Sequence, residues 1–177
     1  FENLYTGDKK LAKAYLAERK ENEDYEVVTQ LPWWWNGGTY TRGAYESLFY
    51  YDAKKKSLTR LTAAGLSVSD VQLTEDKKTV YYSLLDVSVP RPAYFGGADL
   101  YRMELASRRE EAVAKSRPDF NIAAYALGRS FLLLLAADGK YGMNTDIDFY
   151  TLDYETLAVS PCAVYGESIG SSVGSDI

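Results

Sequence analysis

One short motif in the chain has the residue types of a catalytic nucleophile. Residues 166–170 read Gly-Glu-Ser-Ile-Gly, which fits the Gly-x-Ser-x-Gly pattern that holds a reactive serine on a sharp turn between a strand and a helix. Such a serine attacks a carbonyl carbon when a base, usually histidine, takes its proton. The sequence contains no histidine, and the residues after Gly170 are turn-like rather than helical. We therefore expect a loop here, and no catalytic residue in this chain.

Oxygen ligands for a metal ion gather in residues 138–148. This segment contains Asp138, Asn144, Asp146 and Asp148, and Ca²⁺ binds clusters of such groups. Their spacing does not match the EF-hand loop, so we expect a solvated hairpin loop. The single cysteine, Cys162, excludes an internal disulfide or a Cys-x-x-Cys site, and it is expected as a small buried residue. The sequence thus predicts no metal and no cofactor.

Three adjacent tryptophans form the most unusual stretch. Side chains alternate along a strand, so Trp33 and Trp35 would share one face and Trp34 would point the other way. One interpretation is a β-hairpin with large aromatic residues in the core. The other is an aromatic rim for a substrate or partner, formed by Trp33, Trp34, Trp35 and Tyr40. These four are the candidate site residues.

Composition limits the classes of protein that need to be considered. The chain has 177 residues, 46% of them apolar, and a net charge of −5. This charge argues against a generally basic nucleic-acid-binding surface, and no nucleic-acid partner is expected. The longest apolar run, residues 131–137, is far shorter than the roughly 20 residues that span a bilayer, so no membrane association is expected.

The chain pattern predicts one helix followed by many short strands. Asp8 is placed to cap a helix over residues 9–20. From residue 47 onward, short strand-like runs alternate with turns that carry Asp, Gly or Lys, which is typical of an all-β protein. Residues 54–56 and Arg108-Arg109 occupy corresponding turns and are expected to be exposed hairpin tips.

A repeat of about 50 residues is the strongest internal signal. Residues 47–52, 99–104 and 148–153 superpose without gaps, and each of the three segments ends in an acid. Residues 71–82 and 122–133 form a second matching pair, strand, turn and strand. A repeat of this length with about four short strands is typical of a β-propeller blade.

The predicted architecture follows from this repeat. We expect a short N-terminal helix or connector over residues 1–24 and a partial β-propeller of about three four-stranded blades over residues 25–177. The repeats would cover about 25–65, 66–116 and 117–162, with the start of another at 163–177. The alternative is a small β-sandwich whose hairpins resemble one another.

An ordered series of motifs occupies residues 32–37 (Pro-Trp-Trp-Trp-Asn-Gly), 48–52 (Leu-Phe-Tyr-Tyr-Asp) and 58–62 (Leu-Thr-Arg-Leu-Thr). This series resembles the early propeller of acylaminoacyl-peptidase-type enzymes, serine peptidases of the prolyl oligopeptidase family. Residues 73–82 resemble the family's inner turn, Ser-Pro-Asp-Gly-Lys. They depart from it with Thr74-Glu75 for Ser-Pro and Lys77 for Gly. The resemblance covers most of residues 25–177.

The resemblance implies a parent enzyme in two parts. An N-terminal propeller would cover a C-terminal α/β-hydrolase domain that carries the Ser-Asp-His triad and would admit peptides but not folded proteins. This chain would be a non-catalytic, substrate-gating part of a cytoplasmic serine exopeptidase acting on short or N-acylated peptides. Its partners would be the hydrolase domain and the peptide substrate, and alone it is expected to form a homo-oligomer or aggregate.

Two interpretations from other classes stay open at this point. One is a protein-interaction propeller of the TolB or WD type with no enzyme attached. The other is an aromatic-lined β domain that binds sugars.

Overall fold

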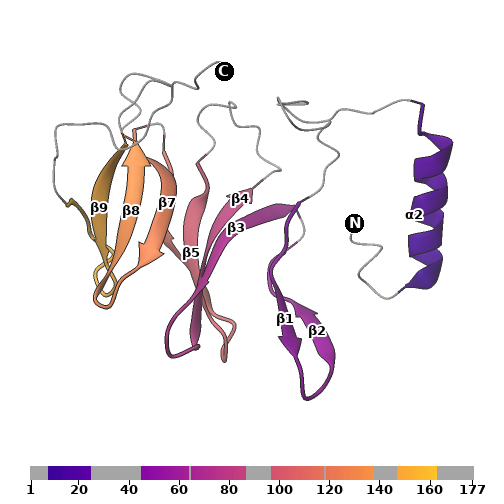
Figure 1. The fold of residues 1–177 in the computed structure, drawn as a ribbon, viewed down its shortest axis with the longest axis horizontal. Coiled ribbons are helices and arrows are strands. Elements are labelled where there is room, and N and C mark those ends of the chain that lie inside the picture. Colours follow the sequence, from indigo (N-terminus) through magenta and orange to yellow (C-terminus); the bar gives the residue numbers. More distant parts are fainter. Residues whose placement is uncertain are drawn as a thin grey trace, which may run out of the picture. The chain divides into compact units, whose positions relative to one another are not determined.

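The computed structural model describes six stretches of the chain: residues 8–24, 45–63, 65–86, 97–117, 119–137 and 147–162. The chain divides into two compact units, Phe1–Ala44 and Tyr45–Ile177. In the first unit the described part is one helix with its flanking residues. In the second it is β-sheet (Figure 1).

Helix α2 spans Lys9–Glu21. It begins where the sequence predicts, because the Asp8 carboxylate accepts hydrogen bonds from the backbone amides of Lys10 (2.9 Å) and Leu11 (3.1 Å). Arg19 lies in the last turn, where a positive charge stabilises the helix dipole. The predicted Asp8-capped helix is confirmed. Within the described ranges, no helix has the length and apolar character needed to cross a membrane.

The described part of the second unit contains three antiparallel sheets, and within each sheet every strand pairs with the next along the chain. The first sheet is a hairpin of β1 (Phe49–Asp52) and β2 (Ser57–Arg60). The second has the order β3 (Leu66–Leu73), β4 (Thr79–Asp86), β5 (Asp99–Glu104) and β6 (Glu110–Ala114). The third joins β7 (Asn121–Leu127), β8 (Phe131–Ala137), β9 (Ile147–Asp153) and β10 (Val159–Pro161).

The expectation of a mostly-β chain with one short helix is confirmed. The two four-stranded sheets occupy residues 66–114 and 121–161, inside two of the expected repeats. That these sheets are blades of a propeller stays a prediction.

The repeated segments correspond to a repeated hairpin turn. Strands β1, β5 and β9 each end in an acid, and the residue four positions later has a positive φ: Asp52 with Lys56 (50°), Glu104 with Arg108 (61°) and Asp153 with Leu157 (56°). In the third turn, the Asp153 carboxylate accepts hydrogen bonds from the amides of Glu155 (3.0 Å) and Thr156 (2.7 Å). An acid recurs at the strand end because it satisfies donors that the turn leaves unpaired.

The second repeated pair needs a gap that the sequence comparison lacked. Residues 74–78 connect β3 to β4, whereas residues 128–130 connect β7 to β8, so the second turn is two residues shorter. The predicted order of strand, turn and strand holds, but the ungapped alignment misplaces the first strands: it sets Leu73, the last residue of β3, opposite Ala124, whereas β7 ends at Leu127. Both first strands also contain a β-bulge, between Ser69 and Gln72 in β3 and between Ile122 and Ala124 in β7.

The core forms on both faces of the sheet β3–β6. One cluster lies between this sheet and β7–β10, and its buried members are Tyr81, Leu100, Val113, Ile122, Tyr125, Leu132, Leu134 and Leu152. The other cluster covers the opposite face: Val68, Val80, Tyr82, Leu84 and Met103, with Leu48 and Leu61 packed against it from beside the β1–β2 hairpin. Since consecutive side chains alternate, neighbouring tyrosines of β4 enter different clusters. The second sheet is therefore packed on both faces.

Candidate functional site at the junction of two sheets

The residues predicted as an aromatic rim lie outside the described residues. This holds for Trp33, Trp34, Trp35 and Tyr40, for the Gly-x-Ser-x-Gly segment at 166–170 and for residues 138–146. The rim, the loop at 166–170 and the hairpin loop stay predictions.

The described stretches contain no group of three or more His, Cys, Asp or Glu side chains placed to hold a metal ion. Cys162, which was expected to be buried, is exposed. It follows the edge strand β10, whose three residues are all exposed, so none of the described sheets packs over this position. The expectation of a buried thiol is therefore wrong. The Cys162 amide still extends the sheet, donating to the carbonyl oxygen of Phe149 at 2.8 Å.

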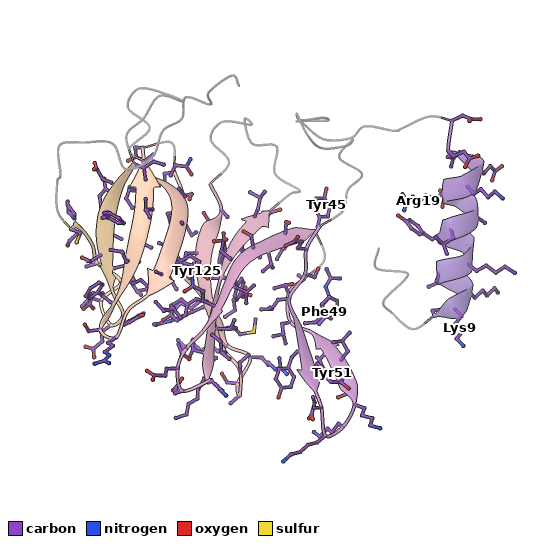
Figure 2. The ribbon with its side chains drawn as sticks, viewed as in Figure 1. Lys9, Arg19, Tyr45, Phe49, Tyr51 and Tyr125 are labelled. Atoms are coloured by element: carbon purple, nitrogen blue, oxygen red, sulfur yellow. The ribbon has the colours of Figure 1, made fainter. Side chains whose placement is uncertain are left out.

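The two four-stranded sheets are joined by hydrogen bonds between their first strands. The Gln72 side chain of β3 donates through Nε2 to the Tyr125 carbonyl oxygen (2.8 Å), and its Oε1 accepts from the Leu127 amide (3.2 Å). The side-chain amide thus satisfies one donor and one acceptor on the edge of β7, as a neighbouring strand would. Figure 2 shows Tyr125 at this junction.

The bulge in β3 supplies a second connection. Asp70 has a φ of 49°, in the left-handed region, and its carbonyl oxygen accepts a hydrogen bond from the Tyr125 hydroxyl. A left-handed residue other than glycine costs about 1–2 kcal/mol, which this contact across the junction helps to offset. Burial, and then the charge of Asp70, raise the pKa of Tyr125. The hydroxyl therefore stays protonated and acts as a donor, not as a base.

A second polar contact joins β5 to the turn after β9. The Arg102 guanidinium pairs with Glu111 on β6 (2.8 Å) and donates from Nη1 to the Tyr154 carbonyl oxygen at 3.1 Å. Desolvation disfavours its charge, but hydrogen bonds to Glu111 and Tyr81 outweigh this, and the pKa of Arg102 is raised. The Tyr81 and Tyr154 rings also meet across the junction, with centroids 6.0 Å apart. Apolar packing between the sheets is thus combined with directional polar contacts.

The sequence reasoning missed both connecting residues. Gln72 is a polar residue inside a strand, and Arg102 lies in the repeated segment 99–104 where the other two segments have Tyr50 and Thr151. Each was a weak signal, because a polar residue on a strand usually faces solvent.

Beside the junction, β3 and β7 expose small and short side chains. We call this the first-strand surface, defined by Ser69, Asp70, Val71, Ala123, Ala124 and Ala126. Two consecutive alanines are exposed because the bulge in β7 interrupts the alternation there. The surface carries one carboxylate, that of Asp70, which accepts a hydrogen bond from the neighbouring Ser69 hydroxyl at 3.2 Å. Its small side chains can line a path or contact a ligand.

A search for related proteins found neither a family model nor a curated protein that matches this chain. The resemblance noted in the sequence therefore stays a hypothesis, which the geometry alone must support.

Proposed function

We propose that the chain is part of a β-propeller, with each sheet a blade. The observation that carries this proposal is the way in which the two complete sheets meet. Each is an antiparallel meander in chain order, and an apolar cluster fills the space between their faces. Among the described strands of different sheets, β3 and β7 lie alongside each other over the most residues. First strands that lie side by side are expected of blades arranged about an axis.

In this proposal the chain is the non-catalytic, substrate-gating part of a cytoplasmic serine exopeptidase of the acylaminoacyl-peptidase type. The catalytic triad would belong to an α/β-hydrolase domain of the same parent protein. Two observations support the assignment: the motif series at residues 32–62 and the absence of histidine from the chain. The first-strand surface would line the path of the peptide, where alanines leave room for an extended chain.

The gating role is tested by narrowing this surface. In the parent enzyme, Ala124→Trp places a bulky side chain on β7, whereas Ala106→Trp makes the same change on the exposed turn after β5. We expect Ala124→Trp to lower kcat/KM for long peptides at least about tenfold more than for an acetylated dipeptide, because a longer substrate occupies more of the path. The control variant should affect both substrates equally. Equal effects of the two variants would refute the gating role.

The alternative, an interaction propeller of the TolB or WD type, also explains a chain without catalytic groups. A fluorophosphonate probe separates the two functions, because it reacts with an activated serine. Labelling of the parent protein together with hydrolysis of acetylated peptides supports the peptidase. A parent protein that shows neither reaction supports the interaction propeller.

A further inference from the structure

The β1–β2 hairpin exposes apolar side chains that the rest of the described sheets do not cover. Tyr51 is 59% exposed and Leu58 is 53% exposed. These two residues are paired across the hairpin, so their side chains lie on the same face. Figure 2 shows Tyr51 on this hairpin.

The same hairpin has an open edge. The Leu61 amide donates to the Leu48 carbonyl oxygen at 2.8 Å, which makes these two residues a hydrogen-bonded pair. Hydrogen-bonded and non-bonded pairs alternate in an antiparallel ladder, so three residues further on the pair Tyr51–Leu58 is non-bonded. The amide and carbonyl of Leu58 therefore point away from β1. In the described part of the chain no strand pairs with that side of β2.

Positive charge lies at the tip of this hairpin and beside Tyr50, whose side chain is on the face opposite Tyr51. Lysines occupy residues 54–56 at the tip of the hairpin, and Arg108 and Arg109 follow on the turn between β5 and β6. The two turns are neighbours, because the Arg108 guanidinium lies 5.1 Å from the centroid of the Tyr50 ring. Arg108 is thus held near the hairpin by a cation–π contact.

The nearby acids are engaged in other contacts. Asp52 accepts hydrogen bonds from the backbone of its own turn and lies 3.9 Å from the Lys55 ammonium. Glu104 accepts from the Ser107 hydroxyl, and Glu110 from the buried Tyr82 hydroxyl. The hairpin itself, residues 49–60, carries four cations and one acid, a charge of 4 − 1 = +3, in a chain whose net charge is −5. The hairpin therefore favours a negatively charged partner.

We propose that β2 binds an extended acidic segment of another protein, which adds to the sheet as a strand. The partner's backbone would pair with the edge of β2 at Leu58. Its apolar side chains would contact Tyr51 and Leu58, and its carboxylates would meet the lysines of the tip. This is the β-augmentation mode of peptide recognition. A second copy of the hairpin is a poor partner, because its own lysines repel the first.

The binding test uses the full chain and a fluorescein-labelled peptide of alternating Glu and Val, followed by fluorescence anisotropy. A peptide of equal charge, with Pro in place of every Val, cannot pair with the edge and is expected to bind at least about tenfold more weakly. The double variant Lys54→Glu/Lys56→Glu should also weaken binding about tenfold, since exposed ion pairs contribute up to about 1 kcal/mol each and 1.4 kcal/mol is a factor of ten. The matched control, Lys9→Glu/Lys13→Glu in α2, makes the same charge change and should leave binding intact.

Each contrary result overturns the proposal. Equal binding of the Pro peptide would rule out strand addition, and equal losses in the two double variants would reduce the effect to net charge. Tighter binding of oligouridylate or of phosphatidylserine vesicles, if lost in Lys54→Glu/Lys56→Glu, would assign the surface to RNA or lipid. Dimers in analytical ultracentrifugation that this variant abolishes would assign it to a second copy.

Discussion

Gln72 offers a direct test of how the two four-stranded sheets are joined. Its side chain makes two hydrogen bonds to the edge of β7, at 2.8 and 3.2 Å. Gln72→Met keeps the length of the side chain but removes both. At about 1 kcal/mol for each hydrogen bond, we expect a loss of about 2 kcal/mol in the free energy of unfolding. With a urea slope of about 1–3 kcal/mol per molar, the midpoint of urea denaturation should fall by about 1 M.

A second substitution at this position separates the two bonds. Gln72→Glu retains the acceptor for Leu127 but sets a carboxylate against the Tyr125 carbonyl oxygen. Repulsion and desolvation raise the folded-state pKa of the introduced carboxyl, so this variant should gain stability as pH falls through that pKa. Val71→Thr is the exposed neighbouring control and should change stability by less than about 0.5 kcal/mol. Urea midpoints for Gln72→Met that match the control would refute the reasoning.

Three further changes probe local structure, each by urea denaturation. Lys77 has a φ of 59°, which is unfavourable for lysine but not for glycine, so Lys77→Gly should stabilise the fold by about 0.5–1 kcal/mol. The control Lys78→Gly should not stabilise it. Equal effects of the two substitutions would contradict a strained turn. A Cβ at Gly97 would lie 1.7 Å from Asn121 Oδ1, so Gly97→Ala should lower the free energy of unfolding by about 1–3 kcal/mol. Adding Asn121→Ala to this variant should restore part of the loss. If it restores none, the clash is not with Asn121. Hydrogen bonds from the backbone amides and the hydroxyl of its turn lower the pKa of Asp153. Its carboxylate therefore stabilises the fold above the unfolded pKa of about 3.9, and this stabilisation is lost as pH falls through the folded pKa. Asp153→Asn should remove this part of the acid sensitivity, and an unchanged pH profile would disprove it.

Local signals in the sequence predicted the elements well, because each depends on neighbouring residues. Asp8 caps a helix by bonding amides two and three residues away, and Asp153 does the same for a turn. The apolar run at residues 131–137 became β8 with alternating burial, which requires only that one face of the strand meets the core.

The junction could not be predicted in the same way. Gln72 and Tyr125 are 53 residues apart in the chain, and their contact depends on the distance and angle between two sheets. The left-handed Asp70 was also missed, since the bulge that needs it appears only once the strand register is set. The aromatic rim at Trp33, Trp34, Trp35 and Tyr40 falls outside the described residues and stays a prediction.

The central claim is that consecutive sheets diverge from a shared axis as blades do. Pulsed electron–electron double resonance measures the distance between two spin labels on introduced cysteines, in a Cys162→Ser background. One pair of labels replaces Val71 and Ala124 on the first strands, and the other replaces Ala112 and Val159 on the last strands. Three strand spacings of about 4.8 Å separate the first strand from the last, and blades in a ring of about 4–8 are rotated by roughly 45–90°. We therefore expect the last-strand distance to exceed the first-strand distance by about 10 Å or more. Equal distances, as in two sheets packed about 10 Å apart in a sandwich, would contradict the propeller.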